Sequence, residues 1–392
     1  MSGGWRDGSR MGAVVVPPLL HTTNGQATGE VNVQQDKIKV QLSGISQTML
    51  GCLWGRAQLS KKYSSLFYDE KAIELVEKID YDDLSTSDDG PLQGLELSFF
   101  RIFSKLDLPE FGLITLRARQ FDEKVKAYIK EHPRASVVTI GAGLDTTFYR
   151  VDNGLIHWYD LDLPAVIDVR RQLLPKPDRV TYIARSIFDP SWCKDVKHTG
   201  DGVFILAGGV LHFFEESQVK QFFSILADNF DGGEIVFNAL SLPDDHFGWW
   251  ADILSSEQRD AIKNALLDAI KGWWKKAPQD QKQKLNDTIA ALDLPTKPKG
   301  TAWSDLEAWW DQLSDKEMLK VMRGFGKSFR SGAGRWELKD AREIAKWDRR
   351  ITVIDQLPMF KDIPRDSLDA GIRRFMDYSD ESGTSCIVHL RV

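Results

Sequence analysis

The sequence predicts a doubly wound α/β domain built on a mostly parallel sheet. Five short apolar runs follow one another, with helical stretches such as 163–174 and 217–229 between them. The runs are Ser136–Ile140, Ile156–Tyr159, Val180–Ile183, Gly202–Leu206 and Glu234–Phe237. Strands that alternate with helices indicate a parallel sheet covered on both faces. Right-handed crossovers then wind the chain in both directions from the first strand.

Composition and charge exclude several classes of protein. The 392 residues suffice for a sizeable core, and an aromatic content of 10% excludes general disorder. A net charge of -6 argues against a nucleic-acid binder, and no apolar run approaches the length of a membrane helix. Three widely spaced cysteines (Cys52, Cys193 and Cys386) suggest neither a disulfide framework nor a zinc site. We therefore expect a cytoplasmic protein with no membrane or nucleic-acid partner, and its oligomeric state stays open.

Periodicity divides the chain into five segments. They are a flexible leader at 1–34, an N-terminal helical cap at 35–134, an α/β core at 135–240, a helical insertion at 241–335 and a C-terminal completion of the core at 336–392. In the cap, helical spacing recurs at Ala72, Leu75, Val76 and Ile79, and again at Phe121, Val125, Tyr128 and Ile129.

The two C-terminal segments carry their own signals. Capping boxes predict three helix starts in the insertion, at Ser255…Gln258, Ser304…Glu307 and Ser314…Glu317. The final segment predicts a strand at Ile351–Ile354, a helix around Ser367–Met376 and a strand near Ser385–Leu390. The insertion therefore follows the fifth strand, at the edge of the sheet where ligands bind.

A glycine turn follows the first strand, and an acid follows the second. The turn is Gly141-Ala142-Gly143, and the acids are Asp160 and Asp162. Glycine lets a ligand approach the backbone closely, and a carboxylate at the end of the second strand accepts hydrogen bonds from ribose hydroxyls. This combination predicts an adenosine-containing ligand rather than a bare turn.

The residues after the turn bear on which ligand binds. Thr146 stands where a dinucleotide-binding fold has its third glycine, and Asp145 precedes it. A carboxylate beside the turn repels a pyrophosphate but suits the sulfonium and ammonium groups of S-adenosylmethionine (SAM). We therefore expect SAM, with an NAD-dependent oxidoreductase as the alternative.

The string GAGLDTTFYR at 141–150, followed by YDLDLP at 159–164, resembles the leucine carboxyl methyltransferase family. It is most similar to the branch of polyketide O-methyltransferases of the tetracenomycin type. Further matches lie at 47–50, 56–57, 68–72, 117–122 and 336–340. The resemblance implies a class I, Rossmann-like methyltransferase fold, with seven strands of which the last is antiparallel.

The resemblance also implies roles for residues around the glycine turn. Arg117 falls where the family binds the methionine carboxylate of SAM, which a guanidinium holds in a fork. Gly141, Ala142 and Gly143 would lie along the methionine part, with Asp145 beside them.

Further family positions follow the later strands. Asp162 matches the ribose-binding acid, with Asp160 beside it, and Ser186 and Ile187 fall where the family contacts adenine. One departure is Gly208, which replaces a glutamate expected to approach the cofactor. We expect the two glycines at 208–209 to widen the space above the methyl group.

Two histidines are candidates for a general base. His212 follows the fourth strand and His246 the fifth. A phenol benefits from a base, whereas a carboxylate is already ionised at pH 7 and needs none. His212 packed at a strand end is the alternative. No metal site is expected, because the run 244–246 is too short to aim three side chains at one ion.

The acceptor is expected to be large and partly apolar. Seven of the 13 tryptophans lie in the insertion, among them Trp249 and Trp250, which are candidates to line the acceptor site. Packing of the insertion's own helices is the alternative. Arg323 and Arg330 belong to a basic run that is either a solvated helix face or a segment that recognises an anionic acceptor.

Together these features predict a SAM-dependent O-methyltransferase that acts on a carboxyl or hydroxyl group of a small molecule. The acceptor would be polyketide-like or another secondary metabolite. A protein C-terminal carboxyl methyltransferase and a non-catalytic SAM-binding protein are the alternatives.

Overall fold

The structure is a computed structural model that describes residues 37–40, 46, 48–80, 115–241, 255–318, 320–321 and 336–392. The leader, His246, Trp249, Trp250, Arg323 and Arg330 lie outside the described residues. The division into five segments therefore stays a prediction.

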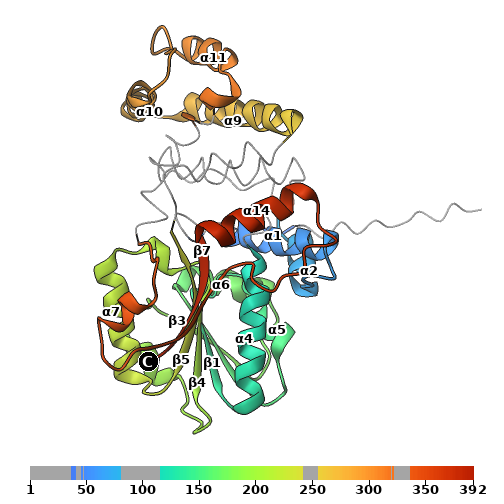
Figure 1. The fold of residues 1–392 in the computed structure, drawn as a ribbon, viewed down its shortest axis with the longest axis vertical. Coiled ribbons are helices and arrows are strands. Elements are labelled where there is room, and N and C mark those ends of the chain that lie inside the picture. The colour runs from blue at the N-terminus through green and yellow to red at the C-terminus, as the bar shows by residue number, and fades with distance from the viewer. Residues whose placement is uncertain are drawn as a thin grey trace, which may run out of the picture. The chain divides into compact units, whose positions relative to one another are not determined.

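Seven strands form one sheet in the order β3-β2-β1-β4-β5-β7-β6. Figure 1 shows this sheet with α7 on one side and α4 and α5 on the other. Their bounds are β1 Ser136–Ile140, β2 His157–Asp162, β3 Val180–Ala184, β4 Val203–Ala207, β5 Glu234–Leu240, β6 Thr352–Pro358 and β7 Ser385–Arg391. The first five strands run parallel, and β7 is antiparallel to both of its neighbours. The expected α/β fold, with seven strands and an antiparallel last strand, is confirmed.

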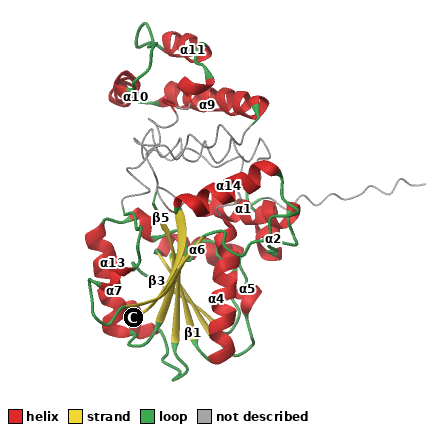
Figure 2. Cartoon of the chain, viewed as in Figure 1, coloured by secondary structure: helices red, strands yellow, loops and turns green. Residues whose placement is uncertain are grey.

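Helices cover both faces of the sheet (Figure 2). The helices outside the insertion are α1 Thr48–Lys62, α2 Glu70–Lys78, α4 Arg117–Glu131, α5 Thr147–Val151, α6 Pro164–Leu173, α7 Glu216–Asn229, α13 Arg342–Ala345 and α14 Ala370–Ser382, with 3-10 turns η3 Pro190–Asp195 and η4 Leu211–Phe213. Successive residues of β1 belong to two different cores: Val138 packs with Phe222 of α7, and Val137 packs with Val125 of α4. The β1 strand is therefore buried on both faces, and the loop after it begins from this core.

The insertion has a hydrophobic core of its own. Its helices are α9 Ser256–Lys276, α10 Gln279–Ala291 and α11 Trp303–Asp311. Trp309 and Trp310 are buried in this core, and Trp273, Trp274 and Trp303 pack against it. The five described tryptophans of the insertion thus pack its helices, which favours the packing interpretation for them.

Two of the three capping boxes are confirmed. Ser255 caps α9 with Gln258, and Ser314 and Glu317 exchange hydrogen bonds in the same way. The prediction for Ser304 is wrong: α11 begins one residue earlier, at Trp303, and Asp305 accepts the backbone N–H of Ala302. Ser304 therefore lies within the first turn and does not cap it.

Candidate functional site

A cavity of about 270 Å³ opens at the carboxyl ends of the parallel strands. Its walls are the glycine loop after β1, the end of β2, the loops after β3 and β4, and the first residues of α1 and α4. The neighbours of β1 are β2 and β4, so the chain winds in opposite directions from this point. Open α/β sheets bind their ligands at such a switch point.

The structure brings most of the predicted site residues to this cavity. Those that line it are Arg117, Gly141, Ala142, Gly143, Asp145, Asp162, Ser186, Ile187 and Gly208. Asp160 and His212 are absent from the lining. The sequence thus located the cavity well but assigned two side chains to it that lie elsewhere.

Both glycines of the turn are required by the backbone. Gly141 has φ +61°, and a Cβ placed on it would overlap Cγ2 of Val210. Gly143 has φ +45°, and its Cβ would lie 3.1 Å from Cβ of Met49. A side chain at either position meets both a disfavoured backbone conformation and a close neighbour. The turn can therefore pass beneath a ligand only as glycine.

Asp162 joins the end of β2 to the glycine loop. Its Oδ2 accepts the backbone N–H of Gly143 at 2.8 Å, and its Oδ1 accepts that of Leu163 at 2.7 Å. Burial raises the pKa of this carboxyl, and the two backbone hydrogen bonds oppose that rise. A carboxylate has about four acceptor positions. Two therefore remain for donors such as the two hydroxyls of a ribose.

Asp160 does not line the cavity, contrary to the sequence-based prediction. It is fully buried, and its Oδ2 pairs with Nη2 of Arg170 at 2.7 Å while its Oδ1 accepts the indole N–H of Trp158 at 3.0 Å. Arg170 also donates to the carbonyls of Gly143 and Asp145, at 3.0 and 2.8 Å. Asp160 does not reach the cavity because it lies two residues before Asp162, about 7 Å further from the carboxyl end of β2. At that depth Arg170 of α6 covers its side chain. Asp160 therefore supports the loop through Arg170.

Asp145 lines the cavity and also anchors the start of α5. Its Oδ1 accepts the backbone N–H of Thr147 at 2.8 Å, and its Oδ2 accepts the hydroxyl of the same residue at 3.1 Å. The carboxylate is thus held in place beside the glycine turn, where it suits a cationic ligand.

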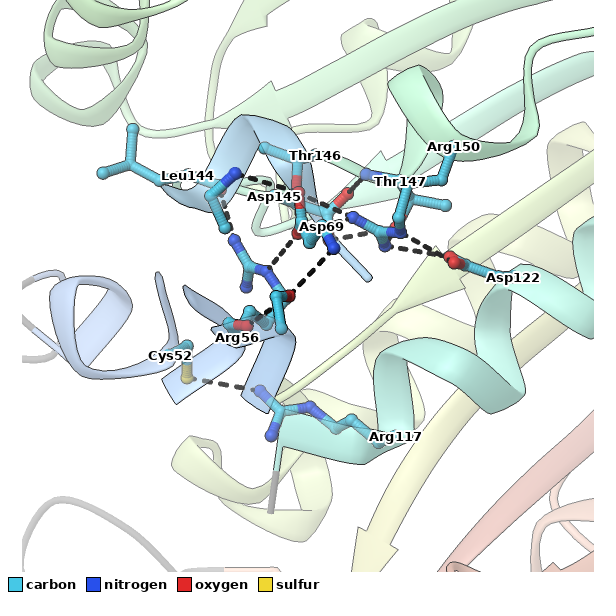
Figure 3. Close-up of polar contacts among 12 residues, drawn as sticks. Cys52, Arg56, Asp69, Arg117, Asp122, Leu144, Asp145, Thr146, Thr147 and Arg150 are labelled. Atoms are coloured by element: carbon cyan, nitrogen blue, oxygen red, sulfur yellow. Dashed lines mark hydrogen bonds and ion pairs between the residues drawn. The ribbon is translucent and has the colours of Figure 1, made fainter. Parts of the chain in front are cut away.

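Arg117 is the first residue of α4 and forms part of the cavity wall. Its Nη2 lies 3.3 Å from Sγ of Cys52 on α1 (Figure 3), and a Cβ on Gly209 would lie 2.8 Å from the same nitrogen. Gly209 is itself held by Asn238, whose Oδ1 accepts its N–H at 2.6 Å. The guanidinium therefore sits close to the backbone that follows β4, where it can receive an anionic group.

The expectation of a widened space at 208–209 is wrong. A Cβ on Gly208 would lie 2.6 Å from Cε2 of Phe121, so the Phe121 ring fills the space beside this glycine. Arg117 fills the space beside Gly209 in the same way. The lack of side chains in this loop lets α4 approach it closely.

The position of His212 does not support the role of general base. The side chain is buried against Phe213, with ring centroids 4.3 Å apart, and its Nδ1 has no hydrogen-bond partner within the described structure. Burial and the charge of Arg117 lower its pKa to about 3. The imidazole is therefore neutral at pH 7 and accepts a proton poorly. Packing at the end of a strand describes it better.

The structure adds lining residues that the sequence analysis did not single out. They include Met49, Cys52, Arg56, Thr139, Arg185, Phe188, Phe213 and Phe214. Met49, Cys52 and Arg56 are spaced by three and four residues, as one helix face requires. That spacing was the available signal, but it does not reveal which partner the face meets. Thr139 contributes a buried hydroxyl that has no hydrogen-bond partner among the described residues.

Comparison with known proteins decides the class of the cavity's ligand. The sequence model of the leucine carboxyl methyltransferase family matches residues 49–225, which span α1, α4 and the strands β1 to β4. The chain is 26% identical over 202 residues to the tetracenomycin polyketide synthesis O-methyltransferase of Streptomyces glaucescens, covering 51% of this chain and 68% of that protein. This confirms the family resemblance. The chain is a SAM-dependent methyltransferase.

A second relative of the methyltransferase is a SAM-dependent methyltransferase of Gibberella zeae. It is 26% identical over 220 residues, covering 52% of this chain and 69% of the relative. Among solved structures, an O-methyltransferase family protein from Burkholderia thailandensis matches with 12% identity and a TM-score of 0.34, over 76% of this chain and 62% of that one. PKMT2 from Rickettsia typhi in complex with AdoHcy matches with 13% identity and a TM-score of 0.30, over 66% and 49%. We therefore describe the fold of the methyltransferase from its own strand order.

No group of three His, Cys, Asp or Glu side chains in the described part of the methyltransferase is arranged to hold a metal ion. None of the helices described is both long and apolar enough to cross a membrane.

Proposed function

We propose that this enzyme transfers the methyl group of SAM to an oxygen of a small molecule, either a carboxyl or a hydroxyl group. The observation that supports this most directly is that Arg117 and Asp162 line one cavity together with the glycine turn. The tetracenomycin relative is described as an O-methyltransferase of polyketide synthesis, which favours a polyketide-like or other secondary metabolite.

The residues of the cavity suit the parts of SAM. Arg117 would hold the methionine carboxylate in a guanidinium fork, and Asp162 would accept the ribose hydroxyls at its two remaining acceptor positions. Ser186 and Ile187, after β3, would contact the adenine. When bound, SAM supplies a methyl carbon that is already electrophilic. The task left to the protein is to align the acceptor with that carbon and to exclude water.

The described lining favours an acceptor that is already ionised, such as a carboxylate, over a phenol. The titratable residues described in its lining are Cys52, Arg56, Arg117, Asp145, Asp162 and Arg185. Both carboxylates in this set already accept backbone N–H groups, and an arginine side chain has donors but no acceptor for a proton. His212, the predicted base within the described structure, is sequestered from the cavity. An acceptor that arrives ionised needs no base.

The test compares matched acceptors with labelled SAM. Aromatic carboxylic acids are assayed beside phenols of the same ring size whose pKa values range from about 7 to 10. We expect methyl esters from the acids, and methyl ethers from the phenols only as the pH approaches each phenol's own pKa. Ether formation from a phenol of pKa about 10 at pH 7, as fast as ester formation, would show that a base is present and contradict the preference.

The alternatives give different products. A protein carboxyl methyltransferase would place labelled methyl on a protein band and form no small-molecule product. A non-catalytic SAM-binding protein would bind SAM but release no demethylated cofactor with any acceptor. The cytoplasmic location and the absence of nucleic-acid partners stay predictions.

A further inference from the structure

A buried network of charged side chains connects α1, α4 and the glycine loop, which are three walls of the cofactor cavity. The residue at its centre, Asp69, does not itself line the cavity. We call this group the Asp69 network; it consists of Arg56, Asp69, Asp122, Thr146 and Arg150 (Figure 3). Arg56 belongs to α1, Asp122 to α4, and Thr146 and Arg150 to the start and body of α5 after the glycine loop. Each of these elements also contributes residues to the cavity or directly follows residues that do.

Asp69 is the centre of this network. Its Oδ2 accepts three hydrogen bonds, from Nε of Arg56 at 3.0 Å, Oγ1 of Thr146 at 2.5 Å and Nη1 of Arg150 at 2.7 Å. Its Oδ1 accepts the backbone N–H of Ala72 at 2.9 Å and so caps α2. The side chain is completely buried. Burial raises the pKa of its carboxyl, but the two guanidinium groups and the hydrogen bonds from Thr146 and Ala72 together outweigh burial, so the pKa is lowered and the group stays ionised.

Arg56 carries the network from Asp69 to the glycine loop. Its Nη2 donates to the carbonyl of Leu144 at 2.7 Å, directly after the second glycine of the turn. On the same face of α1, Met49 and Cys52 line the cavity. The Arg56 side chain thereby links the wall formed by α1 to the loop after β1.

Arg150 carries the network to α4. Its Nε and Nη2 donate to the two oxygens of Asp122 at 2.7 and 2.9 Å, in a bidentate pair. Asp122 lies on the helix that begins with Arg117 and also carries Phe121, and both of these residues line the cavity. The position of α4 relative to the glycine loop therefore depends on Arg150, and the position of Arg150 depends in part on Asp69.

We propose that Asp69 is a positioning residue for the cofactor site. It holds α1, α4 and the glycine loop at the spacing that SAM requires, without lining the cavity itself. Loss of its charge leaves Arg56 buried without its carboxylate and removes one of the two carboxylates of Arg150. The proposal depends on SAM as the ligand of this cavity and is independent of the acceptor.

The test uses Asp69→Asn, since asparagine retains an acceptor for the cap of α2 but loses the charge. SAM affinity is measured by calorimetry, together with kcat, KM for SAM and hydrogen exchange of the Thr48–Lys62 segment. We expect the Kd and KM for SAM to rise about tenfold or more, because small displacements of binding groups have large effects. We expect kcat at saturating SAM to stay within about threefold and α1 to exchange faster.

The control is Glu234→Gln, at the opposite ends of the strands. Glu234 begins β5 and pairs with His389 and Arg391, so this variant also disturbs a partly buried charge cluster. We expect a lower melting temperature with an unchanged Kd for SAM.

A second variant is Arg56→Lys. Lysine keeps a cation beside Asp69, but its single ammonium group cannot replace both the Nε–H bond to Asp69 and the Nη2–H bond to the Leu144 carbonyl. We expect it to bind SAM with an intermediate affinity.

Two results would overturn the proposal. One is wild-type SAM affinity in a folded Asp69→Asn enzyme; the other, should that variant not fold, is wild-type affinity in Arg56→Lys. An equal loss of affinity in Glu234→Gln would also overturn it, because the effect would then reflect general destabilisation. Normal SAM binding by the wild type without methylation of any carboxyl or hydroxyl acceptor would instead contradict the proposed function alone.

Discussion

The Oδ2 atom of Asp162 lies 2.8 Å from the backbone nitrogen of Gly143 and accepts its hydrogen bond. The acid at the end of β2 is thus attached to the second glycine of the turn after β1. In nucleotide-binding folds the glycine turn and the acid lie about 20 residues apart in the sequence, and here a hydrogen bond joins them directly. The hydrogen bond places the Asp162 carboxylate and the backbone of the glycine turn side by side in the cavity wall.

Replacing Asp162 with alanine should weaken SAM binding by about 100-fold. The variant loses the carboxylate that we propose as acceptor for the ribose hydroxyls, and hydrogen bonds to charged groups contribute about 1.5–3 kcal/mol each. Calorimetric titration with SAM measures the effect. Asp168→Ala is the matched control, because Asp168 lies on α6, exposed and paired only with Arg171 among its described ion pairs. Unchanged affinity in Asp162→Ala would exclude the ribose role.

Replacing Gly208 with alanine should destabilise the enzyme by about 1–3 kcal/mol, since the new methyl group overlaps the Phe121 ring. The double variant with Phe121→Leu should recover part of that loss. Urea denaturation measures the free energy of unfolding. Gly272→Ala in α9 has open space around its Cβ and should instead raise stability by about 0.5–1 kcal/mol. Additive effects of the Gly208 and Phe121 substitutions would show that the two residues are not in contact.

His212 should make stability depend on pH in the acid range. Its folded pKa of about 3 lies below its ordinary value of 6.5, so the unfolded chain binds the proton more readily between these values. Stability must therefore fall as pH falls from about 6.5 toward 3, by about 1.4 kcal/mol per pH unit from this residue. The free energy of unfolding of His212→Phe, measured over this range, should fall less steeply than that of the wild type. Parallel curves would mean that His212 is not sequestered from protons.

Truncating Trp310 to alanine should destabilise the insertion by about 3–5 kcal/mol. The side chain is almost fully buried, and its indole N–H donates to the carbonyl of Lys263 at 3.2 Å. Hydrogen exchange across 255–321 measures the loss. The core that contains Trp310 shares no residue with the described cavity lining, so SAM affinity should stay the same. Trp303→Ala, at a partly buried position, should have a smaller effect.

The strands and the cofactor loop were predictable from the sequence because their signals are local. The bounds of β1 match the predicted run Ser136–Ile140, and five buried residues in a row are typical of a strand in the middle of a parallel sheet. The glycine turn and Asp162 were predictable for a related reason. The positive φ angles of the turn call for glycine, and the acid at the end of the second strand follows these glycines at the spacing typical of nucleotide-binding folds.

The surroundings of single side chains were not predictable. Asp160 and Asp162 are two residues apart with the same chemistry, yet only Asp162 reaches the cavity, because Arg170 covers Asp160. His212 follows β4, where a general base could lie, but burial and the charge of Arg117 lower its pKa and make it a poor base.

The sequence by itself thus determined the order of the strands along the chain and the glycine turn, and it predicted SAM as the ligand. Only the tertiary structure decided which charges meet. Asp69 and Arg150 are 81 residues apart, and Arg56 and Leu144 are 88 apart. Apolar periodicity and turn residues act over one element, whereas a buried ion pair depends on where two elements pack, and this is set by the whole core at once.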